Sequence, residues 1–309
     1  MQPLANFNMN LLAALDALLA EQSVSRAAER LHVGQPAMSA TLRQLRTIFK
    51  DPLLVRAGRG LKRSIFADSL QEPLAGILRD VGRLLQSGSA FDPSTSQQSF
   101  TIMASDYVEL VLLRRFLEHV QTIAPSVGLR VIPIDGSLLQ NVRGGHIDLA
   151  IFPAEMQLET RALTVESLFA DDFVCVADAA NPELGDELTL AQLSSLPYLG
   201  VLQGLMSSII DHRLDAAGVS RNTTILTQSF VMAPFMLSGT KMYTILQRRL
   251  VTLLTPQADL RVLEPPITLG ALHEVMMWSP RRGADPGHAW LREELIRTAT
   301  SLGMNRPPS

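Results

Sequence analysis

Apolar residues near the start of the chain recur at the spacing of an amphipathic helix. They predict a first helix over residues 8–21, with a buried stripe formed by Leu11, Leu12, Leu15, Leu18 and Leu19. Ser23 or Ser25 can cap a second helix, in which Ala27 and Ala28 are small enough for another helix to cross closely. We therefore expect the chain to begin with two short, closely packed helices.

The third helix is predicted to have one buried face and one polar face. It starts near Pro36, which loses no hydrogen bond in a first turn, and Gly34 is tolerated as its cap. Its apolar stripe consists of Met38, Leu42, Leu45 and Phe49. The opposite face and its flank carry Gln35, Pro36, Ser39, Ala40, Arg43 and Thr47. Because glutamine, serine and arginine suit base edges and phosphates, this face is typical of a recognition helix in a major groove.

An alternative stays open, because any solvent-facing stripe would look polar and a helix-turn-helix pattern alone is a weak signal. The next segment, residues 51–64 (DPLLVRAGRGLKRS), favours DNA binding. It is expected to be extended around Gly58 and Gly60, and its basic residues are Arg56, Arg59, Lys62 and Arg63. Such a segment suits a wing that contacts the DNA backbone.

The charge of the chain is divided unevenly along its length. The whole chain has a net charge of -3, whereas residues 1–65 hold nine basic and four acidic residues, which is +5, and leave -8 for the rest. A basic block can be a solvated face, but a basic domain on an acidic chain suggests a polyanionic partner. Nucleic acid is the first candidate, and an anionic membrane surface is the second.

Residues 10–60, NLLAALDALLAEQSVSRAAERLHVGQPAMSATLRQLRTIFKDPLLVRAGRG, closely resemble the winged helix-turn-helix of LysR-type transcriptional regulators. They contain that family's patterns AA-x-x-L and QPA-x-S-x-x-(hydrophobic)-x-x-L. The resemblance implies that Arg56 and Arg59 serve the wing and that the major groove receives Gln35, Pro36, Ser39, Ala40 and Arg43. Two features depart from the family: Gly34 replaces a usual serine, and LKRSIF replaces an apolar-Thr-Pro-Arg exit from the wing.

A connecting helix is expected over residues 66–90. Its apolar positions alternate four and three residues apart, as in a coiled-coil seam or an ordinary amphipathic helix: Leu70, Leu74, Ile77, Val81 and Leu84. Pro73 is expected to disturb this helix near its start. The resemblance implies that the helix pairs two subunits, in a homodimer or homotetramer.

The remaining residues, 91–309, are predicted to form an α/β domain. Expected strands are FTIMAS, LRVIPI, DLAIF, DFVCVAD, YLGVL, TTILTQS and MYTIL, and helices are expected at 108–120, 207–217 and 230–238. This alternation indicates a mostly parallel sheet. The resemblance implies an effector-binding domain with two lobes of periplasmic-binding-protein type, lobe I at 98–166 and 270–302 and lobe II at 167–269.

Ligands of open α/β sheets lie beyond the carboxyl ends of the strands, where helix N-termini present free amides. The effector-binding candidates at such positions are Ser105, Asp106, Phe152, Pro153, Gln203 and Gly204, together with Phe230. A plain helix cap explains Ser105 and Asp106 equally well. Phe230 and Met232 are more often core residues than pocket lining.

Other protein classes are disfavoured. Apolar runs such as residues 110–113 are far shorter than the roughly 18 residues of a membrane span, and residues 1–20 do not read as a signal peptide, so a cytoplasmic protein is expected. The lone Cys175 cannot form an internal disulfide, and the six histidines show no metal-ligand spacing. GVLQG has Leu202 where a nucleophile elbow needs serine.

We therefore expect a LysR-type transcriptional regulator, which is not an enzyme and has no cofactor or metal. Its expected partners are double-stranded promoter DNA, a small organic inducer and further copies of the chain, with RNA polymerase as an additional candidate and no membrane. Similarity to the nodulation and nitroaromatic-responsive branch of the family suggests an aromatic inducer. The alternatives are a two-lobed small-molecule-binding protein, which would have no use for residues 1–65, and a ligand-independent repressor on the same fold.

Overall fold

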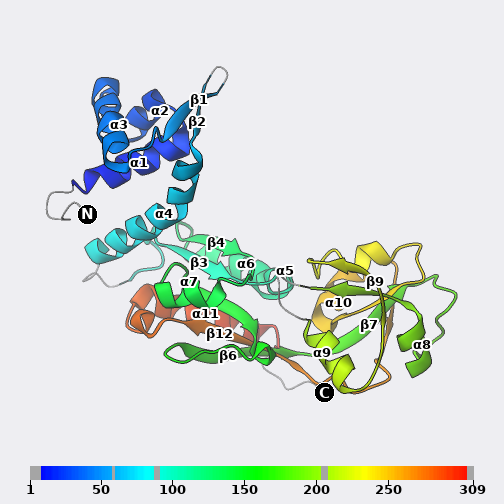
Figure 1. Cartoon of the computed structure of the whole chain (residues 1–309). Helices are drawn as coiled ribbons and strands as arrows, with labels where there is room; N and C mark the ends of the chain where they lie inside the picture. Colours follow the sequence, from blue (N-terminus) through cyan, green and yellow to red (C-terminus); the bar gives the residue numbers. More distant parts are fainter. Residues whose placement is uncertain (1–7, 58–59, 87–90, 203–207, 305–309) are drawn as a thin grey trace. The chain divides into compact units, whose positions relative to one another are not determined.

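The computed structural model describes residues 8–57, 60–86, 91–202 and 208–304. The chain divides into two compact units, Met1–Ser89 and Ala90–Ser309 (Figure 1). Each unit has its own hydrophobic core. Within the described ranges, no helix has the length and apolar character needed to cross a membrane.

The first unit is a three-helix bundle with a two-stranded antiparallel wing (Figure 1). Its elements are α1 (Asn10–Glu21), α2 (Val24–Arg30), α3 (Gln35–Phe49), β1 (Leu54–Ala57) and β2 (Gly60–Arg63). Ala27 and Ala28 are buried, which lets α2 pack closely against α1 and α3. Ser23, and not Ser25, caps α2, because Arg26 N donates to Ser23 Oγ at 3.4 Å.

Helix α4 (Ile65–Gln86) follows the wing and contains Pro73. Its first turns belong to the bundle, because Leu74 is buried in the core of the first unit and Leu70 packs against that core. Ile77 is 46% exposed. Two of the predicted seam residues are thus used within the unit, whereas the side chain of Leu84 lies outside the described residues.

The first lobe of the second unit is a five-stranded sheet in the order β4-β3-β5-β12-β6 (Figure 1). The strands are β3 (Ser99–Met103), β4 (Gly128–Ile132), β5 (Leu149–Pro153), β6 (Thr164–Asp171) and β12 (Leu272–Trp278). Its helical elements are α5 (Asp106–Val108), the π-helical turn η2 (Glu109–Leu113), α6 (Arg114–Ile123), α7 (Leu138–Gly144), the short turns η3 (Ala154–Met156) and η5 (Pro280–Arg282), and α11 (Pro286–Ser301).

The second lobe is a five-stranded sheet in the order β11-β7-β10-β8-β9. Its strands are β7 (Phe173–Asp178), β8 (Pro197–Val201), β9 (Asn222–Thr227), β10 (Tyr243–Gln247) and β11 (Leu260–Leu263). The helices are α8 (Leu190–Ser195), α9 (Ile209–Ala216), α10 (Arg248–Leu254) and the 3₁₀ turn η4 (Pro234–Leu237). This 3₁₀ turn stands where an α-helix over residues 230–238 was expected.

The expectation of mostly parallel sheets was wrong for half of the strand pairs. In each lobe two neighbouring pairs are parallel and two are antiparallel. The antiparallel pairs involve strands at the two crossings of the chain between the lobes, β6 to β7 and β11 to β12. Because β6 continues to Asp171 in the first sheet, the first crossing comes a few residues after the expected boundary at 166/167.

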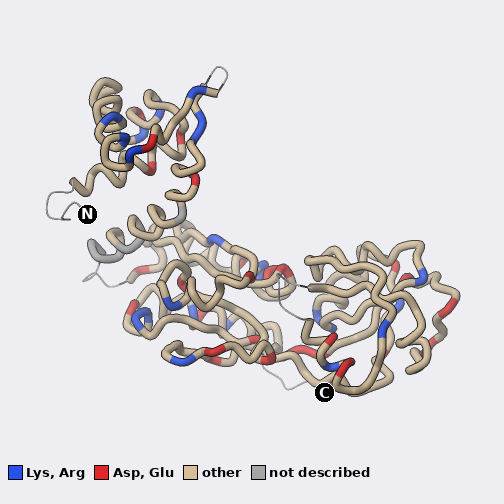
Figure 2. The backbone as a smooth tube through the Cα atoms, viewed as in Figure 1, with Lys and Arg blue, Asp and Glu red and all other residues tan. Residues whose placement is uncertain are grey.

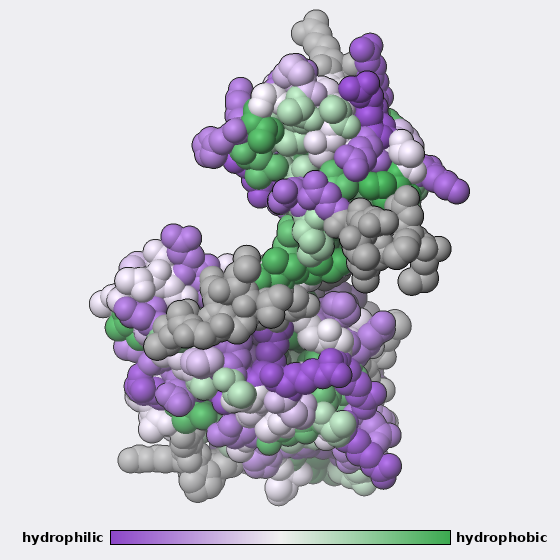
Figure 3. All heavy atoms as spheres, turned by 90° about the vertical axis from the view of Figure 1, so that its left-hand side faces the viewer, coloured by the Kyte–Doolittle hydropathy of each residue, from purple (hydrophilic) through white to green (hydrophobic). Residues whose placement is uncertain are grey.

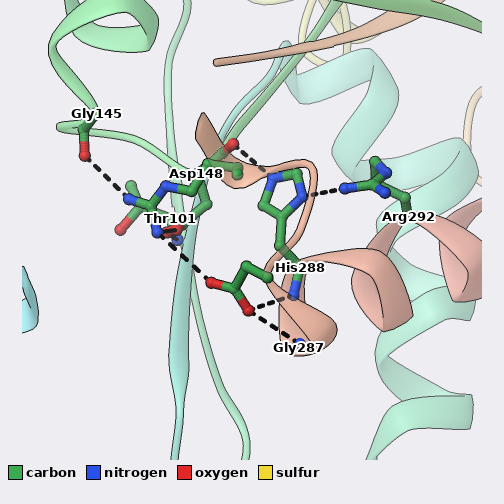
Figure 4. Close-up of polar contacts among 8 residues, drawn as sticks. Thr101, Gly145, Asp148, Gly287, His288 and Arg292 are labelled. Carbon is green, nitrogen blue, oxygen red and sulfur yellow. Dashed lines mark hydrogen bonds and ion pairs between the residues drawn. The ribbon is translucent and has the colours of Figure 1, made fainter. Parts of the chain in front are cut away.

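Buried polar contacts fasten the returning chain to the first lobe (Figure 4). Asp148 accepts a hydrogen bond from Thr101 N at 2.8 Å and pairs with Arg282 at 3.0 Å. His288 Nε2 donates to the Asp148 carbonyl at 2.9 Å, and Arg292 donates to Nδ1 of the same ring. Burial lowers the pKa of His288, so the neutral ring can donate at one nitrogen and accept at the other. The contacts fix α11 and η5 against β3 and the start of β5.

Candidate DNA interface and effector cleft

Helix α3 presents the face that was predicted for DNA. Met38, Leu42 and Leu45 are buried in the bundle. On the other side Ser39 is half-buried, and the exposed residues are Gln35, Pro36, Ala40 and Arg43. Gln35 Nε2 makes only a long contact, 3.5 Å, with Ser39 Oγ. All five candidates are therefore at least partly open to a partner.

Gly34 caps α3 without a side-chain hydrogen bond. Its φ of -69° and ψ of 141° are ordinary extended values that any residue adopts. A Cβ at this position would meet only Pro36 Cδ at 3.7 Å, an ordinary van der Waals distance. Glycine in place of the usual serine therefore leaves α3 without a capping hydrogen bond, and the surrounding space does not require a glycine.

Four cations of the first unit have neither an ion pair nor a side-chain hydrogen bond among the residues described: Arg43, Lys50, Arg56 and Lys62. Figure 2 shows basic residues along both wing strands. Arg46 has a structural role, because it donates to the carbonyls of Pro52 and Leu54 at 2.8 and 2.9 Å and holds the start of the wing. Arg59 lies outside the described residues.

A cavity of about 70 Å³ lies between the two lobes of the second unit. Most of its lining is apolar and includes Ile134, Phe173, Val201, Ile209, Phe230 and Leu272. Its polar lining residues are Ser105, Tyr107, Ser208, Gln247 and Glu274. No lysine, arginine or histidine is among the lining residues that the structure describes.

Ser105 and Asp106, the first effector candidates, have different roles. Val108 N donates to Ser105 Oγ at 3.2 Å, so Ser105 caps α5 and also lines the cavity. Asp106 bridges the lobes: its carboxylate accepts from Ser229 Oγ at 2.7 Å and from the amide of Val231 at 3.1 Å. It therefore binds the second lobe and does not face the cavity.

A buried Tyr-Asp pair lies at the first crossing between the lobes. Tyr107 donates to Asp171 Oδ2 at 2.7 Å, and the amide of Arg249, at the start of α10, donates to the same carboxylate oxygen at 3.2 Å. Burial raises the pKa of both Tyr107 and Asp171. The pair connects α5, β6 and α10 beside the cavity.

Arg213 of α9 holds the second crossing. It donates to the carbonyls of Gly270 and Ala271 at 2.9 and 2.6 Å, and its guanidinium lies 5.3 Å from the centre of the Phe173 ring. It also lies 3.6 Å from Glu155 of the first lobe. Its two terminal nitrogens are used in these contacts, and Arg213 is not among the described lining residues of the cavity.

Glu274 and Gln247 are buried polar residues on the cavity wall, one from each lobe. Their exposed fractions are 1% and 4%, and among the described residues Glu274 Oε2 and Gln247 Oε1 have no hydrogen-bond partner. Burial, with smaller contributions from Glu155 and Asp171, raises the pKa of Glu274 to about 8. The pairing of β12 with β6 is irregular directly after Glu274, and such bulges often re-aim a side chain next to a site.

The structure brings only some of the predicted effector residues together. Ser105, Pro153 and Phe230 line the cavity, whereas Phe152 is 2% exposed and lies in a separate core cluster on the other face of β5. Gln203 and Gly204 lie outside the described residues. Glu274 was not among the predicted residues, although a carboxyl within the apolar run LHEVMMW was a signal for it.

Comparison with protein families identifies both units. Residues 9–64 match the bacterial regulatory helix-turn-helix of the lysR family, and residues 94–300 match the LysR substrate binding domain. The chain belongs to the LysR family of transcriptional regulators, as the resemblance indicated. Members of this family are regulators and not enzymes, and they bind DNA and small-molecule effectors and form oligomers.

The similarity to individual relatives extends over nearly the whole chain. Nodulation protein D 1 of Mesorhizobium japonicum is 33% identical over 297 residues, which cover 96% of this chain and 94% of that protein. Nodulation protein D 2 of Rhizobium leguminosarum bv. phaseoli is 32% identical over 303 residues, covering 97% of this chain and 95% of that protein.

Solved structures show the same fold. A probable transcriptional regulator from Pseudomonas aeruginosa superposes with a TM-score of 0.80 at 26% identity and covers 96% of this chain and 98% of its own. Full-length CbnR, solved in complex with its target DNA, has a TM-score of 0.66 at 16% identity and covers 95% of this chain and 100% of its own.

Proposed function

We propose that the exposed face of α3 enters the major groove of promoter DNA. Gln35, Ser39 and Arg43 would reach base edges, and the small surfaces of Pro36 and Ala40 allow close approach. The main support for this proposal is that Arg43 is exposed and has no acidic partner among the described residues. In the wing Arg56 and Arg59 would contact phosphates.

In this proposal an effector binds between the two lobes and changes promoter binding. The cavity of about 70 Å³ is smaller than the roughly 300–1,000 Å³ of ordinary ligand sites, so a ligand must part the lobes. Contacts such as Asp106 to Ser229 would then change with occupancy. Only a ligand that favours one lobe arrangement can shift the regulator between states.

We infer that the protein acts as a homodimer or homotetramer in the cytoplasm. Two recognition helices about one DNA turn apart bind more tightly than one. Helix α4 carries exposed apolar residues that suit subunit pairing: Ile65, Phe66 and Ile77. Figure 3 shows apolar surface below the bundle, along the described part of α4. RNA polymerase is a further partner in this proposal.

The test is the substitution Arg43→Ala, measured by gel shift on a specific and a scrambled duplex. Loss of a base contact is expected to cost about 1–3 kcal/mol on the specific duplex and to relax preference at one position. Arg161→Ala is a control, because Arg161 is an exposed arginine of the second unit. Unchanged binding to both duplexes would show that α3 does not read the DNA.

A ligand-independent repressor on the same fold is the alternative. It predicts that no ligand of the cleft alters promoter binding. Glu274 and Gln247 each have a buried polar atom without a partner among the described residues. This favours a ligand-responsive regulator, because such groups are rarely left unsatisfied without a functional reason.

A further inference from the structure

The chemistry of the cavity wall restricts what the effector can be. Glu274 on β12 belongs to the first lobe, and Gln247 at the end of β10 belongs to the second. Both line the same cavity, and each is more than nine-tenths buried. Two polar side chains from opposite lobes thus meet the space where a ligand would enter.

The described part of the cavity wall offers hydrogen bonding but no positively charged side chain. Neither Arg213 nor Arg249 is among the described lining residues: Arg213 donates to backbone carbonyls of the second crossing, and Arg249 lies 3.9 Å from Asp171 and donates to the carbonyl of Gly303. Besides burial, the negative charges of Glu155 and Asp171 raise the pKa of Glu274, so the charges that act on this side chain are acidic. A ligand carboxylate would therefore be desolvated near acidic groups, with no counter-ion among the described lining residues, which is strongly unfavourable.

The remainder of the lining favours an apolar ring. Phe173 comes from the first crossing and Phe230 from the loop that Asp106 fastens. Aromatic side chains bind rings through offset or edge-to-face contacts in addition to the apolar area that they bury. A ring between the two phenylalanines would place its substituents near both lobes.

We propose that the effector is an uncharged, mainly apolar ring compound whose hydroxyl group hydrogen-bonds Glu274, with Gln247 as a second partner from the opposite lobe. This inference rests on the proposed function, since it assumes that the effector occupies the interlobe cavity. A ligand held by both side chains would connect the lobes through its own hydrogen bonds. Its hydroxyl would satisfy the oxygen that has no partner among the described residues.

The test uses full-length protein and matched probes that differ in one group. Benzyl alcohol is compared with benzoate, and phenylethanol with phenylacetate, by calorimetry and thermal shift at neutral pH and millimolar concentration. We expect the alcohols to bind at least about tenfold more tightly than their carboxylates, because only the carboxylates carry an uncompensated charge. Equal or tighter binding of the carboxylates, or binding of neither series, would overturn the inference.

Substitutions of Glu274 and Gln247 distinguish a loss of ligand binding from a loss of folding. Glu274→Met is expected to weaken alcohol binding about tenfold, whereas Glu274→Gln keeps a hydrogen-bonding group of similar size and most of the affinity. Gln247→Met is expected to weaken binding as well, and it serves as the second variant if Glu274→Met folds poorly. Glu166→Met changes an exposed carboxyl on the adjacent β6 and should leave binding unchanged. Alcohol binding that survives both Glu274→Met and Gln247→Met would refute the assignment.

Gel-shift measurement of promoter binding in the same samples distinguishes the inference about the effector from the proposed control of promoter binding. If the alcohols bind through Glu274 but leave promoter binding unchanged, the inference stands and the effector-controlled switch fails. If carboxylates bind in the cavity and alter promoter binding, the switch stands and the inference fails.

Discussion

At the scale of single residues, the buried carboxyl of Glu274 connects ligand binding with stability. Burial raises its pKa from 4.5 to about 8, so the folded chain keeps a proton that the unfolded chain has released in that pH range. Stability must therefore fall as pH rises from about 4.5 to about 8. The slope for one such group is at most about 1.4 kcal/mol per pH unit.

The substitution Glu274→Gln is expected to remove this dependence. Near pH 5 the variant and the wild type should unfold at similar temperatures, and by pH 8 the variant should be more stable by a few kcal/mol. Thermal unfolding of the second unit across this pH range measures the difference. The exposed Glu166→Gln is the control, and parallel pH profiles for all three proteins would contradict the prediction.

A second residue-scale prediction concerns Gly34. Gly34→Ser adds a side chain at an ordinary backbone geometry with free space and restores an N-cap hydrogen bond to α3. Capping and the loss of unfolded-state freedom together should stabilise the first unit by about 0.5–1 kcal/mol. Chemical denaturation measures this gain, with Gly34→Ala as the control that lacks the hydroxyl. If serine stabilises no more than alanine, the cap does not form.

At the scale of elements, one part of the apolar face of α4 packs on the first unit and another part is exposed. Leu70 and Leu74 pack on the core of the first unit, while Ile77 stays exposed. If Ile77 lies in a subunit interface, Ile77→Glu should split the oligomer, because a carboxylate cannot remain unpaired in an apolar seam. Light scattering should show a smaller assembly. Leu253→Glu, at another exposed apolar residue, should keep the native size; equal behaviour of both variants would place the interface elsewhere.

Some helices and strands could be predicted from the sequence, and others could not. Helices α1 and α3 could be predicted because their apolar stripes are periodic and Pro36 marks the start of α3, and α2 could be predicted from its serine cap and its two small alanines. The strand β12 was not predicted as such, because LHEVMMW mixes an apolar run with a charge. The antiparallel pairs also escaped prediction, since pairing direction depends on where the chain crosses between lobes and not on local pattern. Phe152 and Glu274 show the same limit, because the face of a buried strand that borders a cavity depends on tertiary packing.

At the scale of the whole effector unit, the Asp106 carboxylate holds the second lobe through Ser229 Oγ and the amides of Phe230 and Val231. Asp106→Ala removes all three hydrogen bonds, so the two amides should exchange with solvent about tenfold faster or more. DNA binding should persist, because the first unit has its own core.

Hydrogen exchange of the full-length protein, followed by mass spectrometry of the peptide that contains residues 229–232, measures the effect of Asp106→Ala. Asp135→Ala is the matched control, because Asp135 accepts from Ser137 within the first lobe and crosses no boundary. If the hydrogen bonds of Asp106 take part in the effector-controlled change of promoter binding, Asp106→Ala should also change the affinity for any ligand of the cleft. The lobes of the variant separate more easily, but they hold the ligand with fewer contacts. Exchange that stays as slow as in the wild type would mean that Arg213 and the buried Tyr107-Asp171 pair fix the lobes without Asp106.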